Sequence, residues 1–426
     1  MASDSIFALS SGRPPAAVSV IRVSGPGAHD AGRRIAGALP DARFASVREL
    51  RNPLTGELLD EALVLRFDAP ASATGEDVLE LQCHGGRAVV DSVLSVLGSI
   101  DGLRQAQPGE FTRRAFENGR IDLTEAEGLA DLIEAETEAQ RKAALMIAEG
   151  GLRKQIEIWQ DRVLVLSAAA ERLIDYDEED EAVDPALLGG CNELAAELRG
   201  WLSRPRVETL KDGVRVVVAG PPNVGKSSLI NAIAGYERAI VTDIPGTTRD
   251  HIEVPLALEG LPVLLTDTAG LRRTEDAVEA IGVARAERLA AAADVLVWLG
   301  DPDSVPGHAE PIKVHARADM PGRQNTPAGS IAVSAVTHEG LGALLERIAA
   351  AAREMLPPAD AISLNRRQAL HLGSVANALD QAAASPEPVL VAEGLRGARN
   401  AFDQLTGRAG MEDVLDALFG RFCLGK

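Results

Sequence analysis

Aromatic residues are scarce in this chain: eight Phe, three Trp and two Tyr make up 3% of its 426 residues. Its cores must therefore be built from aliphatic side chains. Cysteine is also rare, and the three that occur, Cys83, Cys191 and Cys423, are too few and odd in number for a disulfide framework. This usage indicates a reducing compartment.

No apolar run approaches the roughly 18 residues that a membrane-spanning helix needs. The first residues, MASDSIFALSSGRPP, lack the basic start and apolar run of a secretory signal. We therefore expect a cytoplasmic protein with no membrane contact. Basic residues number 43 and acidic residues 63, giving a net charge of −20. This argues against a protein that coats nucleic acid by bulk electrostatics, although a local basic groove is compatible with it.

The middle of the chain alternates short apolar runs with helical patterns, which is typical of a parallel sheet wrapped by helices. The expected strands are Val214–Ala219, Val263–Thr266, Val295–Leu299, Ile312–His315 and Ile331–Ser334. The expected helices are Lys226–Ala234, Val278–Ala292 and Leu341–Glu354. At about 150 residues per domain, the length predicts further domains on both sides of this segment.

The flanking segments have different patterns. The first 115 residues are typical of an α+β domain, with strands at Ala17–Val23, Leu63–Phe67 and Val78–Gln82 and a helix at Ala88–Leu97. A helical pattern begins at Thr124, which we expect to form a capping box with Glu127. It breaks at the acidic run 176–184 and resumes at Leu187–Trp201 and after Pro358. We therefore predict a multidomain α/β protein: an N-terminal α+β domain (1–118), an all-helical domain in two parts (119–210 and 357–426) and an inserted α/β domain (211–356).

A phosphate-binding loop opens the inserted domain. Residues 220–227, GPPNVGKS, match G-x-x-x-x-G-K-[ST] between an expected strand and an expected helix. The glycines let backbone N–H groups point at phosphate oxygens, Lys226 neutralises the β- and γ-phosphates, and Ser227 is placed to bind Mg²⁺. The alternative is a glycine-rich turn that happens to carry a lysine. The candidate nucleotide-binding residues here are Asn223, Val224, Gly225, Lys226, Ser227 and Ser228.

Two later segments complete the pattern of a triphosphate switch. Asp267 ends an expected strand and is placed to hold Mg²⁺ through water, and the Gly270 amide is placed to sense the γ-phosphate. Thr248 is the candidate second Mg²⁺ hydroxyl, in a loop that we expect to order with triphosphate. Together with the loop, these segments resemble the translation-factor class of GTPases and predict a Ras-like P-loop GTPase domain with helices on both faces of the sheet. The candidate residues are Thr242, Asp243, Ile244, Pro245, Gly246, Thr247, Thr248, Asp267, Thr268, Ala269 and Gly270.

Recognition of the base is altered in this chain. Such GTPases carry Asn-Lys-x-Asp, whose aspartate accepts hydrogen bonds from guanine, and the segment here is Ala316-Arg317-Ala318-Asp319. Asp319 remains, and Ser334 and Ala335 fit the usual base-flanking pair. We favour GTP and GDP as ligands, with reduced affinity or selectivity; the alternative is that Asp319 is a surface turn residue. Leu271 follows DTAG where small GTPases place a water-orienting glutamine, so we assign that role to Glu279, which is otherwise a solvated helix residue.

Motifs along nearly the whole chain resemble those of the MnmE (TrmE) family of tRNA uridine-modifying GTPases. The N-terminal motifs are VIRVSG (20–25), TGEDVLELQ (74–82), HGG (84–86), PGEFT (108–112), RAF (114–116) and DLTEAE (122–127). The inserted domain has the phosphate-binding loop, TDIPGTTRD (242–250) and DTAGLR (267–272), and the chain ends FCLGK (422–426). The family architecture is an N-terminal domain followed by a helical domain that a GTPase domain interrupts, which agrees with our prediction.

The resemblance implies that the N-terminal domain binds 5-formyltetrahydrofolate, or a related tetrahydrofolate, and dimerises. It places Arg22, Glu80, Arg120 and Lys426 in the folate site. The family usually has Lys where this chain has Arg120, and arginine would pair with the glutamate-tail carboxylate in a different geometry. Arg22 on its strand also fits a structural ion pair. Cys423 matches a family cysteine needed for the modification; its alternative is a small buried apolar side chain.

The resemblance also implies how GTP is hydrolysed and used. GTPase domains would pair in a homodimer around K⁺, held by Asn223, Thr242, Ile244 and Thr247, with Glu279 orienting the water. An FAD-dependent partner, MnmG (GidA), would join in a heterotetramer or larger assembly. Together they would add a carboxymethylaminomethyl or aminomethyl group to carbon five of the tRNA wobble uridine, using a tetrahydrofolate one-carbon unit.

Three alternatives remain at this point. A GTPase switch in ribosome assembly explains the inserted domain but leaves both flanking domains and the Cys-Leu-Gly-Lys end unexplained. A folate-dependent aminomethyl transferase with a purely regulatory GTPase domain explains the N-terminal segment. A scaffold that does not hydrolyse GTP is disfavoured by the intact Lys226, Ser227, Thr248 and Asp267.

Overall fold

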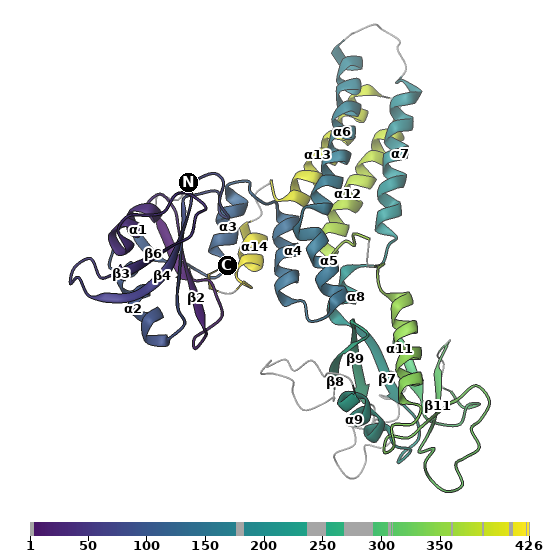
Figure 1. Ribbon diagram of the computed structural model, residues 1–426. Helices are drawn as coiled ribbons and strands as arrows, with labels where there is room; N and C mark the ends of the chain where they lie inside the picture. Colours follow the sequence, from purple (N-terminus) through teal and green to yellow (C-terminus); the bar gives the residue numbers. More distant parts are fainter. Residues whose placement is uncertain are drawn as a thin grey trace, which may run out of the picture. The chain divides into compact units, whose positions relative to one another are not determined.

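A computed structural model describes most of the chain (Figure 1). The described residues are 4–175, 183–236, 253–267, 293–305, 308, 310–358, 361–385, 387–408, 412–422 and 424–425. The chain forms two compact units: one of residues 1–130 with 403–426, and the other of residues 131–402. None of the helices in the described ranges combines the length and apolar content needed to cross a membrane.

The first unit is built on a six-stranded sheet in the order β3-β4-β5-β2-β1-β6. Neighbouring strands are antiparallel except β1 and β6, which are parallel. The strands are β1 (Ser5–Leu9), β2 (Val18–Ser24), β3 (Ser46–Arg51), β4 (Leu58–Phe67), β5 (Val78–His84) and β6 (Leu103–Gln105). The three strands and the helix expected in this region are confirmed, with longer bounds for β4; β1, β3 and β6 were not expected.

Two helices, α1 (Ala28–Ala36) and α2 (Arg87–Gly98), pack on this sheet. Their core is aliphatic, as the composition predicts: the valines and leucines of α2 meet alternate residues of the central strands. A second, smaller core joins α3 (Glu110–Glu117), α4 (Leu123–Glu134) and α14 (Glu412–Phe419). The carboxyl end of the chain is thereby part of the N-terminal unit.

The capping box expected at Thr124 is wrong by two residues. Asp122 Oδ1 accepts from Glu125 N at 2.9 Å, and Glu125 Oε2 accepts from Asp122 N at 2.8 Å, so this pair caps α4. Thr124 lies inside the helix and donates to Asp122 Oδ1. The earlier start places Leu123, fully buried, on the packed face of the helix. Two pairs in this segment fit the capping-box pattern, Asp122 with Glu125 and Thr124 with Glu127. The first pair caps the helix because the earlier start buries Leu123.

One part of the second unit is built from long helices. They are α5 (Glu138–Ala148), α6 (Gly151–Asp175), α7 (Pro185–Leu202), α12 (Arg366–Ala383) and α13 (Pro388–Thr406), with α6, α7, α12 and α13 lying side by side (Figure 1). Trp159 on α6 is fully buried, meets the Trp201 ring edge-on at 5.1 Å and donates to Glu197 Oε1 at 2.8 Å. A large aromatic with its N–H satisfied, packed against Trp201 and Phe402, thus anchors this core.

The second sheet has six strands in the order β12-β11-β10-β7-β9-β8. Its strands are β7 (Val214–Ala219), β8 (Glu253–Leu258), β9 (Leu261–Asp267), β10 (Val295–Trp298), β11 (Ile312–Ala316) and β12 (Ile331–Val333). The five expected strands are parallel and confirmed within two residues, whereas β8 was not expected and is antiparallel to β9. The helices described here are α8 (Val207–Asp212), α9 (Lys226–Tyr236) and α11 (Leu341–Met355). The helix expected at Val278–Ala292 lies outside the described residues.

Candidate functional site

The loop from Gly220 to Gly225 connects the end of β7 to the start of α9. Three of its residues have positive φ: Gly220 at 151°, Asn223 at 59° and Gly225 at 108°. Glycine and asparagine are the residues that adopt this conformation at low cost. A loop that ends at a helix N-terminus in this way forms a cradle of N–H groups for phosphate. Val224 packs against the core of the sheet and so anchors the loop to it.

Lys226 is the first residue of α9 and is buried. Its Nζ donates to the carbonyl oxygens of Gly220 at 2.9 Å and Pro221 at 2.7 Å. The ammonium group is therefore folded back across the loop. Two neutral carbonyls are weak partners for a cation compared with phosphate oxygens, because hydrogen bonds between charged groups are stronger.

Ser227 and Asp267 bring two oxygen groups together beside this lysine. Asp267 ends β9 and pairs in register with Val218 of β7, so its carboxylate lies at the carboxyl edge of the parallel strands. Ser227 Oγ donates to Asp267 Oδ2 at 2.8 Å, and Asp267 is only 2% exposed. Hard oxygen donors at a phosphate-binding loop are the ligand set that Mg²⁺ prefers.

A cavity of about 130 Å³ lies between this loop and the ends of β11 and β12. Gly225 and Ser228 line one side, and Arg317, Asp319 and Ala335 line the other. Arg317 has φ of 58°, and its Nε would lie 3.4 Å from a Cβ placed on Gly225, so its side chain lies against the loop.

The carboxylate of Asp319 is exposed and makes no hydrogen bond with the described residues. Ser334 is fully buried and fixes the turn after β12, since its Oγ accepts from Val336 N at 3.2 Å and Thr337 N at 3.1 Å. This turn presents Ala335 to the cavity. The cavity thus has an apolar wall, a free carboxylate and a guanidinium, which suit a purine ring with N–H donors on its edge.

The sheet of the first unit holds a second candidate site. Arg22 on β2 and Glu80 on β5 are directly opposite in register, and Arg22 Nη2 lies 2.8 Å from Glu80 Oε1. The Arg22 guanidinium also lies 5.7 Å from the Phe111 ring centroid. Both charged groups are partly exposed, at 24% and 17%. The structural ion pair considered for Arg22 is present, and it leaves both side chains open to a ligand.

The carboxyl end of the chain returns to the same sheet. Ser10 Oγ donates to Gly425 O at 2.8 Å across 415 positions of sequence. Leu9, next to Ser10, pairs with Ile21, the neighbour of Arg22. Gly425 is thus docked at Ser10, just after β1, and β1 pairs with the strand that carries Arg22.

Arg120 is exposed at the end of the helical turn after α3. Its Cγ would lie 3.1 Å from a Cβ placed on Gly75, so its stem covers the loop of residues 74–76. The same loop is held from inside by Arg114, which is 3% exposed and pairs with Glu76 and Glu110 at 3.2 Å each. Burial raises the pKa of the Glu110 carboxyl, but the hydrogen bond and charge of Arg104 outweigh it and hold that pKa below its ordinary value.

Known proteins match this chain over its full length. Residues 5–120 match the model described as GTP-binding protein TrmE N-terminus, and residues 123–423 match the MnmE helical domain. A tRNA modification GTPase MnmE from Rhizorhabdus wittichii is 54% identical over 100% of this chain and 97% of its own length. The chain belongs to the MnmE family. A second member, from Novosphingobium aromaticivorans, is 49% identical over 100% of both chains.

A solved structure of the G domain of the FeoB iron transporter of T. maritima is 27% identical to this chain. The match covers 33% of this chain and 98% of that structure. Its TM-score is 0.24, which is too low to add to the MnmE assignment.

Several expected site residues lie outside the described residues. They are Thr242, Asp243, Ile244, Pro245, Gly246, Thr247, Thr248, Thr268, Ala269, Gly270, Glu279, Cys423 and Lys426. Sequence reasoning missed the buried Arg114, although RAF was among the MnmE-like motifs. It also missed Ser10. No sequence pattern marks a serine whose hydroxyl donates a hydrogen bond to a carbonyl far along the chain.

Proposed function

We propose that this chain, as an MnmE-family GTPase, couples GTP hydrolysis at the loop of residues 220–227 to modification of tRNA at carbon five of the wobble uridine. An FAD-dependent partner of the MnmG type would act with it, and a tetrahydrofolate would provide the one-carbon unit. The observation that carries the proposal is the joint presence of two sites in one chain. One is the phosphate loop with Lys226, Ser227 and Asp267, and the other is the sheet that carries Arg22 and on which Gly425 docks at Ser10.

GTP hydrolysis needs positive charge near the phosphates, and the side chains that would supply it already lie together at the loop. Lys226 would bind β- and γ-phosphate oxygens, which are stronger partners for an ammonium group than the carbonyls of Gly220 and Pro221 because they are anionic. Attack of water on the γ-phosphorus breaks its bond to the bridging oxygen and leaves GDP and phosphate, and the lysine stabilises the negative charge on the oxygens as that bond breaks. Glu279 is the proposed group that orients the water.

Magnesium fits this site, because the Ser227 hydroxyl lies beside the Asp267 carboxylate, which would hold the ion through water, with Thr248 as the proposed second hydroxyl ligand. A bound Mg²⁺ would neutralise phosphate charge. Potassium would be held by Asn223, Thr242, Ile244 and Thr247 when two GTPase domains pair. The exposed Asn223 side chain makes no hydrogen bond to a described residue, so its carbonyl is available as a ligand.

Guanine would be recognised in the 130 Å³ cavity. The free carboxylate of Asp319 would accept from the ring N1–H and the 2-amino group of guanine, neither of which adenine has at that edge. Arg317 would lay its planar guanidinium against the base, a contact that arginine makes more readily than lysine. Ala316 has no side-chain amide to offer the base, so we propose that this chain binds guanine through fewer hydrogen bonds than proteins with Asn-Lys-x-Asp.

The tetrahydrofolate would lie on the sheet of the first unit. Arg22, Arg120 and Lys426 offer cations for its carboxylates, and Glu80 offers an acceptor for the N–H groups of its ring. The fit is supported by the Arg22–Glu80 pair, which is open to solvent, and by the aromatic face of Phe111 beside it. A bound folate would supply the carbon that bridges uridine and the amine. Cys423 and Lys426 are proposed to act here because Gly425, which lies between them in the sequence, is docked at Ser10.

The test is nucleoside analysis by mass spectrometry of unmodified tRNA incubated with the full chain, the flavoprotein partner, GTP, a tetrahydrofolate and an amine source. We expect a carboxymethylaminomethyl or aminomethyl uridine that disappears with Lys226→Ala. Lys154→Ala, on α6, is the matched lysine control and should modify tRNA normally. Wild-type chain that hydrolyses GTP but leaves uridine unmodified would overturn the proposal and favour a GTPase switch without modification chemistry.

A further inference from the structure

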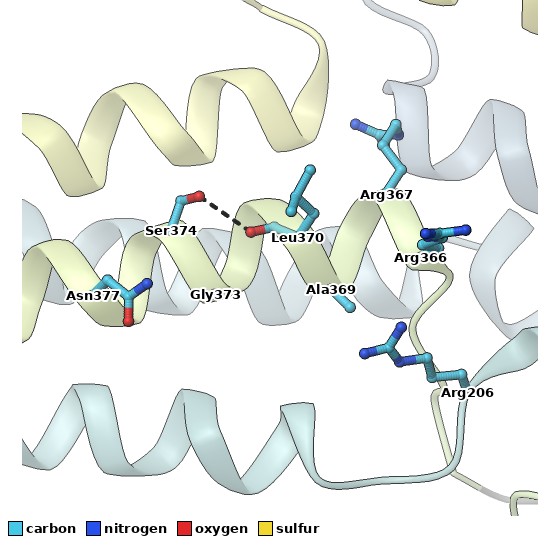
Figure 2. Close-up of a pocket in the computed structure, with 8 residues that line it drawn as sticks. All are labelled: Arg206, Arg366, Arg367, Ala369, Leu370, Gly373, Ser374 and Asn377. Atoms are coloured by element: carbon cyan, nitrogen blue, oxygen red, sulfur yellow. Dashed lines mark hydrogen bonds between the residues drawn. The ribbon is translucent and has the colours of Figure 1, made fainter.

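A cleft of about 810 Å³ lies in the helical part of the second unit, away from the phosphate loop. One end is lined by Arg206, in the segment after α7, and by Arg366 and Arg367, in the first turn of α12. Figure 2 shows Arg206 and Arg366 reaching this end from two different segments. Three guanidinium groups thus line one cleft in a chain whose net charge is −20.

Two of these arginines, Arg206 and Arg366, differ from arginines on the neighbouring helices α6 and α7. Arg162 pairs with Glu197, and Arg199 pairs with Asp380. By contrast, the guanidinium groups of Arg206 and Arg366 form no ion pair or hydrogen bond with any residue in the described ranges. The carboxylate near them, Glu208, uses one oxygen to accept from the backbone N–H of Arg366. The cleft therefore has an excess of positive charge.

The backbone at the start of α12 adds little to this charge. Asn365 caps the helix and accepts from Gln368 N, and Glu208 accepts from Arg366 N. These N–H groups are already satisfied, so an incoming anion would be bound by side chains. Arginine side chains present two parallel N–H donors each, which match the oxygens of a phosphate.

The cleft continues along one face of α12, and this face is open. Leu370 is 68% exposed, Gly373 has no side chain, and Ser374 and Asn377 are exposed (Figure 2). A groove with cations at one end that continues past Leu370, Ser374 and Asn377 along α12 fits a polymer backbone better than a compact anion. It offers no arrangement for reading base edges, which suits contacts that position a nucleic acid without selecting its sequence.

We propose that the Arg206–Arg366–Arg367 cleft binds the phosphodiester backbone of the tRNA. The inference rests on the proposed function in taking tRNA as the substrate. The cleft also lies where the nucleotide-binding segment joins the helices: Val207 N donates to Leu364 O at 3.2 Å, so the chain enters and leaves that segment side by side. RNA bound at Arg206 and Arg366 would contact both connections directly.

The test is fluorescence anisotropy with a labelled, unmodified tRNA transcript and the full chain over a range of KCl concentrations. The variant R206Q/R366Q/R367Q is compared with R206K/R366K/R367K, which keeps the charge, and with R172Q. Arg172 is exposed at the end of α6 and has no ion pair with a described residue, so R172Q removes one positive charge outside the cleft. GTP hydrolysis and thermal unfolding serve as controls for folding.

We expect the triple glutamine variant to bind tRNA about tenfold or more weakly at 50 mM KCl, with a salt slope shallower by about 2, as expected for the loss of about three phosphate contacts. The lysine variant should keep most of the binding, and R172Q all of it. A triple glutamine variant that binds tRNA like wild type overturns the proposal. So does a variant that loses only its binding to the flavoprotein partner, which would make the cleft a protein interface.

The proposed function and the assignment of the cleft can be refuted separately. If wild-type chain and partner modify tRNA and the glutamine variant still binds it normally, the proposed function stands and the cleft is wrong. If wild-type chain with its partner neither binds nor modifies tRNA, the proposed function fails and this inference fails with it.

Discussion

Gly425→Ala tests whether docking of the carboxyl end matters for the modification chemistry. Gly425 has φ of 96°, and a Cβ there would lie 2.0 Å from Leu9 O. Backbone strain at positive φ costs about 1–3 kcal/mol, and forcing an atom into a packed contact costs about 1–3 kcal/mol more. A total of about 2–6 kcal/mol lowers the docking equilibrium by roughly 30- to 25,000-fold.

The assays are calorimetric titration of 5-formyltetrahydrofolate into the full chain and the tRNA modification reaction. Both should fall by at least tenfold in Gly425→Ala, while GTP hydrolysis by the chain alone should stay within twofold of wild type. Gly37→Ala is the matched control, because Gly37 also has positive φ, at 70°, but nothing lies within 4 Å of its added Cβ. Wild-type folate affinity and modification in Gly425→Ala would refute the placement of the folate chemistry beside the docked end.

Other residues give sharp tests of the account. Trp159→Ala should lower the free energy of unfolding in urea by about 3–5 kcal/mol, because it empties the largest buried side-chain volume of the helical core. Cys83 should resist alkylation at pH 8 until the chain is unfolded, as peptide mass mapping would show, since burial raises its pKa to about 12. Glu110→Gln should destabilise the protein at pH 7, and by progressively less as the pH falls below about 4.5. Arg104 holds the pKa of this carboxyl below its ordinary value, so its stabilising effect is complete above the pKa of the unfolded chain and is lost as the pH falls through the lower pKa of the folded protein. Ala316→Asn should tighten GTP binding in a calorimetric titration by restoring an amide to the base cavity.

The sequence predicted the second sheet well because its strands are continuous apolar runs bounded by turns, a pattern that buried parallel strands require. It missed β8, which contains Pro255. Proline normally argues against a strand, but β8 is an edge strand, where a missing N–H is tolerated. The short strand β6, three residues long, carries too little periodicity to be recognised.

The phosphate loop could be predicted because its residues are adjacent in sequence, so spacing alone defines its chemistry. The contact of Ser10 with Gly425 could not be derived from spacing, since it joins positions 415 apart. The arginine cleft was equally hidden. Arg206 and Arg366 come together only because α7 and α12 pack side by side, and single exposed arginines in a sequence carry no signal of where their neighbours will be.

The central claim is that the loop around Lys226 hydrolyses GTP, with Asp319 selecting the base and K⁺ assisting. Steady-state hydrolysis of GTP and of ATP by the purified chain, each in KCl and in NaCl, tests it most directly. The account predicts hydrolysis of GTP alone, stimulated by K⁺ and abolished by Lys226→Ala. Equal rates in both salts, or ATP used as readily as GTP, would contradict it.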